Sequence, residues 1–167
     1  MGRLKHVLSV LVNDQPGVLA RVAGLFSRRG FNIESITVGN AEEAGLSRMT
    51  LVTSGDERTL EQIMKQLHKL VDVIKVNDLT EEAMVARELV LIKVAATATT
   101  RPEITHLIEP FRAAIVDVGR NSLVVQATGD MDKIDALIEL LRPYGIKEIA
   151  RTGVTALMRG SLVKVRV

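Results

Sequence analysis

The segment Asn13-Asp14-Gln15-Pro16-Gly17 combines residue types suited to holding a small zwitterion. It follows an apolar stretch and precedes a helical pattern that begins at Val18. The start of a helix presents unpaired backbone N–H groups and a partial positive charge. Gly17 lets a carboxylate approach those groups without a side chain in the way, and Asp14 can accept a hydrogen bond from an ammonium group. The loop could therefore bind the carboxylate and the ammonium group of a free amino acid.

A structural interpretation of the same loop competes with this one. Asp14 is a residue type that caps helices, and Pro16-Gly17 is a common turn sequence. In that interpretation the loop only connects a strand to a helix. The loop alone leaves both interpretations open.

Other kinds of site are poorly supported by the sequence. The three histidines, at positions 6, 68 and 106, lack the spacing of metal ligands. Cysteine is absent, which excludes thiolate nucleophiles and disulfides. Ser47 has no evident histidine base, and no glycine-rich phosphate loop occurs. We therefore expect no catalytic residue, no metal and no cofactor in this chain.

Composition indicates a folded protein with an aliphatic core. Of the 167 residues, 47% are hydrophobic, but only three are Phe, one is Tyr and none is Trp. No apolar run has the length of a membrane span or a signal peptide. The formal charge is only +2, and scattered basic residues with few aromatics give little support for nucleic-acid binding. We expect a cytoplasmic protein that binds neither membranes nor nucleic acid.

The elements around the loop form a recognisable order. Strand patterns occur at 4–12, 32–38, 46–53 and 71–76. Helical spacing begins at Val18 and stops at Gly30, and a second helix follows Asp56, a plausible N-cap. The order strand, helix, strand, strand, helix, strand is the split βαβ arrangement of the ferredoxin-like fold.

The second half repeats this order without repeating the loop. We expect strands at 88–96, 114–118, 123–128 and 146–150, one helix starting at 100–102 and another capped by Asp130. The fold class is thus α+β, with tandem ferredoxin-like domains at 1–79 and 88–167 and a linker at 80–87. Within the linker, residues 81–86 could form a short helix. Since only the first half has the loop, only that half is expected to hold a small molecule.

Both faces of the first predicted sheet are partly apolar. In the first strand Leu8, Val10 and Val12 share one face, while Val7 and Leu11 lie on the other. A ferredoxin-like unit covers only one face with helices, so the other requires a cover. Another subunit or the second half of this chain could supply it.

Several longer motifs resemble a known family. The Asp-x-Pro-Gly loop and the later Phe31-Asn32-Ile33-Glu34-Ser35 resemble the ACT domain. More narrowly, Ser27 to Val38, Leu46 to Thr50, Leu60 to Ile63 and Gln66 to Val73 are similar to the small subunits of acetolactate synthase, as is Ala150 to Gly153. Together these motifs are specific and cover almost the whole chain.

The resemblance implies where an effector would bind. ACT domains of this family pair edge to edge as homodimers, with effector sites between the first loop of one chain and the second strand of the other. Carried over to this sequence, the site residues are the following: Asp14, Pro16, Gly17, Val18, Leu19, Asn32 and Ile33. The family binds valine and often related branched-chain amino acids. Some members have Asn in place of Asp14, so effector affinity could differ from theirs.

The resemblance also implies a role without catalysis. The chain would be the regulatory subunit of acetolactate synthase, acting in branched-chain amino acid biosynthesis by activating a catalytic subunit and conferring feedback inhibition. Thiamine diphosphate, FAD and magnesium would belong to the catalytic subunit, which the second domain would help to contact. The alternative is an ACT-type protein that regulates a different amino-acid enzyme.

Overall fold

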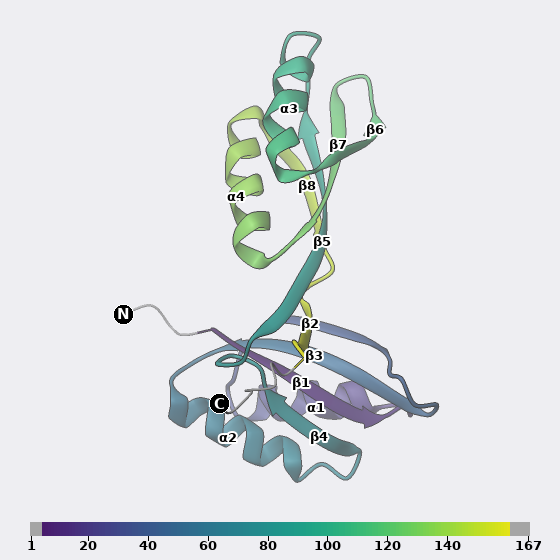
Figure 1. The fold of residues 1–167 in the computed structure, drawn as a ribbon, viewed down its shortest axis with the longest axis vertical. Helices are drawn as coiled ribbons and strands as arrows, with labels where there is room; N and C mark the ends of the chain where they lie inside the picture. The colour runs from purple at the N-terminus through teal and green to yellow at the C-terminus, as the bar shows by residue number, and fades with distance from the viewer. Residues whose placement is uncertain (1–4, 161–167) are drawn as a thin grey trace, which may run out of the picture. The chain divides into compact units, whose positions relative to one another are not determined.

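The computed structural model describes residues 5–160, which form two compact units. The first unit comprises residues 5–85 together with 154–160, and the second comprises residues 86–153. Each unit has its own sheet, and two helices cover one face of that sheet (Figure 1). Within residues 5–160, no helix is both long enough and apolar enough to cross a bilayer.

The first unit is a βαββαβ fold built on a four-stranded antiparallel sheet. The strands lie in the order β2-β3-β1-β4, so β2 and β4 form the edges. The elements of this fold have the following bounds: β1 Lys5–Asn13, α1 Val18–Arg28, β2 Ile33–Asn40, β3 Leu46–Ser54, α2 Glu57–His68 and β4 Val73–Asp78. The predicted order of elements is confirmed.

Local signals explain where the two helices begin and end. The carboxylate of Asp56 accepts a hydrogen bond from the N–H of Thr59 at 2.8 Å, which caps α2. After α1, Gly30 adopts a φ of 68° and Phe31 donates its N–H back to the carbonyl of Phe26. A left-handed glycine with this reversed bond is a common way to end a helix. Both termini agree with the sequence-based expectation.

The face of the first sheet away from its helices is covered by β9, Thr155–Met158. This short strand contacts β1 and β3, and it pairs with the start of β5. Val154 and Ala156 are buried, as are Val7 and Val52 on the sheet. Val154 donates its N–H to the hydroxyl of Ser35 and accepts from the hydroxyl of Thr37, both at 2.9 Å. A segment from the end of the chain therefore supplies the expected cover.

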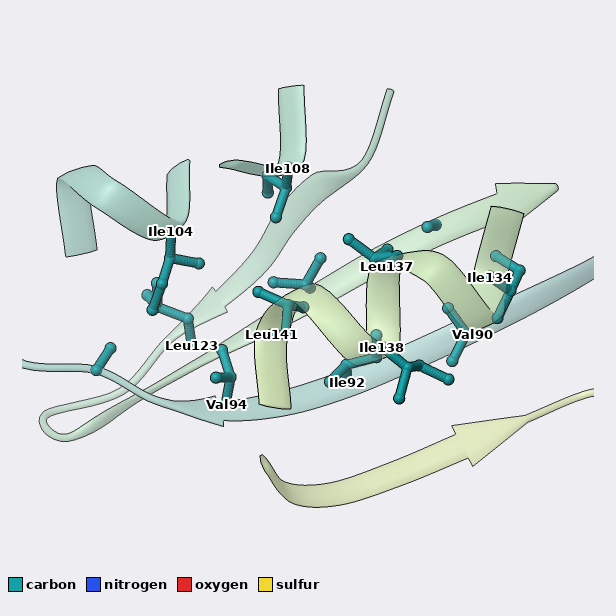
Figure 2. Packing of buried hydrophobic residues seen from close by; sticks show 13 residues of the cluster. Val90, Ile92, Val94, Ile104, Ile108, Leu123, Ile134, Leu137, Ile138 and Leu141 are labelled. Atoms are coloured by element: carbon teal, nitrogen blue, oxygen red, sulfur yellow. The ribbon is translucent and has the colours of Figure 1, made fainter. Parts of the chain in front are cut away.

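The second unit has the same arrangement of helices on a sheet of order β6-β7-β5-β8. Aliphatic side chains from β5, β7, α3 and α4 fill the space between sheet and helices (Figure 2). The elements have the following bounds: β5 Met84–Ala95, α3 Thr100–Ile108, β6 Ala114–Val118, β7 Ser122–Gly129, α4 Met131–Leu141 and β8 Ile146–Arg151. Short 3₁₀ helices follow α3 and α4, at Glu109–Phe111 and Arg142–Tyr144.

The structure differs from the sequence-based expectations around the linker and near the end of the chain. Residues 81–86 form a turn and the start of β5, so the prediction of a short linker helix there is wrong. The expected second domain ran from 88 to 167, whereas residues 154–160 belong to the first unit. The chain leaves the first unit near 85 and returns to it at 154.

Candidate functional site

The loop between β1 and α1 is shaped by Gly17, which is the N-cap of the helix. Gly17 has a φ of 87°, a left-handed conformation that residues with a Cβ rarely adopt. A Cβ at this position would lie 3.0 Å from Nη1 of Arg21. Glycine is therefore favoured by the backbone conformation and by the close approach of a neighbouring cation.

Asp14 does not cap α1, so the capping interpretation of this residue is wrong. The N-cap is Gly17, and the helix has no side-chain cap. Instead, the N–H of Asp14 donates to the carbonyl of Gly45 at 2.8 Å, which fixes the loop to the β2–β3 hairpin. The side chain of Asp14 is exposed and makes no hydrogen bond within residues 5–160, so it remains available to a ligand.

The first turn of α1 offers free backbone donors. The N–H of Val18 is 3.3 Å from the carbonyl of Gln15. The N–H groups of Leu19 and Ala20 find no acceptor among the described residues. With no acidic side chain in this turn, the partial positive charge of the helix is not neutralised locally. An anion would meet uncompensated donors here.

Apolar and polar surfaces meet at the same turn. Val18 is 3% exposed and packs in the core, whereas Leu19 is 47% exposed. Pro16 and Gly17 are exposed as well. Leu19 therefore leaves aliphatic surface uncovered beside the free amides, an arrangement that fits a ligand with a charged end and an apolar end.

Asn32 and Ile33 mark the start of β2. The carbonyl of Asn32 accepts a hydrogen bond from the buried hydroxyl of Thr53 at 2.7 Å, which fixes the backbone. The amide side chain of Asn32 is exposed and has no partner within the described part of the chain. Ile33 is half-buried and packs against the core. Asn32 can thus offer a donor and an acceptor to a ligand from outside its own unit.

The structure does not bring these two groups of residues together within one chain. Asn13, which precedes the loop, is paired with Leu46 at one end of the sheet. Ile33 is paired with Thr53, which is paired with His6 at the other end. With a rise of about 3.3 Å per residue, the two ends lie roughly 20 Å apart. In a single chain the predicted site residues therefore fall into two separate groups, which would each be half of a shared site.

Sequence reasoning missed Arg21 and Asp72, which lie beside the loop. Nε and Nη2 of Arg21 donate to Oδ2 of Asp72 at 2.9 and 2.6 Å. The carbonyl of Asp72 also accepts the N–H of Asn13 at 2.9 Å. The signal was the spacing of Arg21 from Gly17, because residues four apart are neighbours on a helix.

The remaining candidates have structural or surface roles. His6 is buried, and its Nε2 lies 3.0 Å from the carbonyl of Gly55. His68 and His106 are exposed on α2 and α3. Within residues 5–160, no three His, Asp or Glu side chains are grouped as a metal site would require.

The fold and the loop define the class of the first unit, which is an ACT domain. A family model described as "AHAS small subunit-like ACT domain" matches residues 8–75. A second model, described as "Small subunit of acetolactate synthase", matches residues 87–160. With the near-full-length relatives that follow, the two models show that the chain as a whole belongs to the small subunits of acetolactate synthase.

Individual proteins support this membership. A probable acetolactate synthase small subunit from Archaeoglobus fulgidus is 57% identical over 158 residues, covering 95% of this chain and 99% of the relative. The acetolactate synthase small subunit of Bacillus subtilis is 56% identical over 162 residues, covering 96% and 94%. The crystal structure of the small subunit from Thermotoga maritima has a TM-score of 0.86 at 46% identity, covering 95% of this chain and 99% of that one.

Membership in this family settles the general role. The chain is a regulatory, non-catalytic subunit in branched-chain amino acid biosynthesis. A small subunit of this enzyme associates with a large, catalytic subunit.

Proposed function

We propose that the chain binds valine, or a related branched-chain amino acid, at a site shared by two copies of its ACT domain, and that binding imposes feedback inhibition on the large subunit of acetolactate synthase. The observation that carries this proposal is the separation of the two half-sites at opposite ends of one sheet. In this proposal each chain contributes one half of the site.

An antiparallel pairing of two β2 strands would bring the half-sites together. β2 is an edge strand, so its outer backbone groups are available to a partner. Its last residue, Asn40, pairs with Ser47, which pairs with Val12 near the loop. A two-fold axis at β2 places the start of the partner's strand beside the end of this one. The partner's Asn32 and Ile33 would then approach the loop at Gly17.

The chemistry of the loop fits an amino acid with a short aliphatic side chain. The free amides of Leu19 and Ala20 suit the carboxylate, and Asp14 suits the ammonium group. Leu19, with the partner's Ile33, supplies apolar contact for the side chain. Because one methylene contributes only about 1–3 kcal/mol to discrimination, we expect leucine and isoleucine to bind as well.

A ligand that contacts two chains stabilises the arrangement of the dimer that it bridges. Coupling to the large subunit needs only about 1–3 kcal/mol of difference in ligand affinity between two states. The regulatory chain therefore needs no reactive group of its own. In this proposal thiamine diphosphate, FAD and magnesium belong to the large subunit.

Replacement of Gly17 tests the site directly. We expect Gly17→Asp to abolish valine binding in calorimetry and valine inhibition of the reconstituted holoenzyme, because a carboxylate would occupy the anion position. Gly17→Asn is the matched control, since Asn has the same shape and tolerates a positive φ about as well as Asp. The control should keep measurable valine binding, so the difference between the variants isolates the charge.

Full valine sensitivity in the Gly17→Asp holoenzyme would overturn the site assignment. Equal loss in both variants would show that the backbone conformation, rather than an anion position, is what Gly17 provides. Failure of the unsubstituted protein to bind any branched-chain amino acid would overturn the proposed function as a whole.

A further inference from the structure

The guanidinium group of Arg21 lies where the loop and the first turn of α1 meet. Long side chains on a helix point back toward its N-terminus, so a residue covers the turn that precedes it. Arg21 accordingly extends over Gly17, and its Nη1 lies 3.0 Å from the position of a Cβ on that glycine. The cation therefore lies beside Gly17, the residue from which the helix with the free first-turn amides begins.

Asp72 holds the guanidinium in this position through two of its three nitrogen atoms, Nε and Nη2. Nε and Nη2 donate to the same carboxylate oxygen, Oδ2, at 2.9 and 2.6 Å. The side chain of Asp72 is 13% exposed and that of Arg21 is 49% exposed. Nη1 of Arg21 has no hydrogen-bond partner among residues 5–160, and it is the nitrogen nearest to Gly17.

The backbone ties the same pair to the loop. The carbonyl of Asp72 accepts the N–H of Asn13 at 2.9 Å, and the N–H of Arg21 donates to the carbonyl of Gly17 at 2.9 Å. Asp72 thus contacts both the backbone of Asn13, at the start of the loop, and the side chain of Arg21, which extends over Gly17. This arrangement fixes the free edge of the guanidinium relative to the amides of the first turn.

We propose that Arg21 donates a charged hydrogen bond from Nη1 to the carboxylate of the bound amino acid, and that Asp72 is the positioning residue that sets its direction. The inference rests on the proposed function, because it assigns a contact within that site. It adds a charge requirement that backbone amides alone do not impose. The site selects free α-amino acids with an ionised carboxylate over their neutral amides.

The test compares valine with valinamide, which keeps the ammonium group and the side chain but lacks the carboxylate. We expect Arg21→Gln to weaken valine binding by about tenfold to a hundredfold, the usual loss for a charged hydrogen bond. Binding of valinamide should stay unchanged. Calorimetry measures valine binding to the full chain, and an NMR titration measures the weaker valinamide.

The same helix offers a matched control. Arg28 lies over Gly24, four residues before it, just as Arg21 lies over Gly17. Its Nη1 is 3.1 Å from the position of a Cβ on Gly24. Arg28→Gln removes the same charge from the same helix, away from the loop, and should leave valine binding unchanged. Arg21→Lys, which keeps the charge but not the forked geometry, should recover part of the affinity.

A double-mutant cycle tests the role of Asp72. Asp72→Asn should change the dissociation constant for valine in the unsubstituted chain but not in Arg21→Gln, because it acts through that side chain. Equal weakening of valine and valinamide by Arg21→Gln, or no weakening of either, would overturn the inference. Absence of valine binding in the unsubstituted chain would overturn the proposed function first.

Discussion

At the scale of single residues, caps and glycines decide where the elements around the site begin and end. Gly17, Gly30 and Asp56 each act through a local backbone requirement, and such requirements are visible in a sequence. Asp14 shows the limit of this reasoning. It belongs to a residue type that caps helices, but it lies three residues before the N-cap. A residue type suggests a role, and the position of the backbone decides it.

The Asp56 cap makes stability depend on pH. The hydroxyl of Thr59, with its N–H, lowers the pKa of Asp56 below its ordinary value of 3.8. A carboxyl whose pKa is lower in the folded state stabilises that state above the ordinary value, and the effect is lost as the pH falls through the lowered pKa. We expect Asp56→Asn, which still caps the helix, to lose less stability than the unsubstituted chain between neutral pH and about pH 3.

Urea unfolding at the two pH values measures this difference. Glu81→Gln is the control, because Glu81 is exposed and makes no hydrogen bond within residues 5–160. That variant should follow the unsubstituted chain. The same acid-induced shift of the urea midpoint in Asp56→Asn and in the unsubstituted chain would contradict the assigned role.

At the scale of elements, sequence patterns predicted the eight strands β1 to β8 and the four helices α1 to α4, but they did not predict β9. The strands of both sheets have apolar patterns long enough to be recognised. Thr155–Met158 is only four residues long, and its apolar residues do not alternate cleanly. Its place depends on hydroxyl contacts from Ser35 and Thr37, more than a hundred positions earlier. Contacts so distant in sequence leave no local signal.

The packing of β9 on the first sheet predicts that a charge introduced at Ala156 lowers stability much more than the same charge at Leu157. Ala156 is 3% exposed, whereas the next residue, Leu157, is 60% exposed. Ala156→Asp would bury a carboxylate without a partner, and we expect it to reduce the free energy of unfolding by about 3 kcal/mol or more. Leu157→Asp should change it by less than about 0.5 kcal/mol. Equilibrium urea unfolding compares the two, and equal midpoints would show that β9 is not firmly packed.

At the scale of the whole molecule, the candidate site stays a prediction, and the structure adds where its residues lie in one chain. The loop and the start of β2 were both identified from motifs. Their separation within one chain follows only from strand register, which requires the paired residues Asn13 with Leu46 and Ile33 with Thr53. The ion pair of Arg21 and Asp72 was missed for a similar reason, because the two residues are 51 positions apart.

A site shared by two chains can be tested by complementation. Gly17→Asp damages the loop and leaves Asn32 intact, whereas Asn32→Ala damages the start of β2 and leaves the loop intact. Dimers of either variant alone then have no complete site. A mixed dimer has one complete site and one doubly damaged site. Random exchange of chains should therefore restore about a quarter of the valine-binding capacity of the unsubstituted protein, since half of the dimers are mixed and each has one site of two.

Calorimetry before and after denaturation and refolding of an equal mixture measures this recovery. The control is the same procedure with Gly17→Asp and Arg21→Gln, which both affect the loop side and should not complement each other. Because Asn32 is exposed and its backbone is held by Thr53, Asn32→Ala should keep its melting temperature. If the refolded mixture binds no more valine than the two variants bind separately, the site is not shared between chains. That result would contradict the proposed arrangement of the two groups of residues across a dimer.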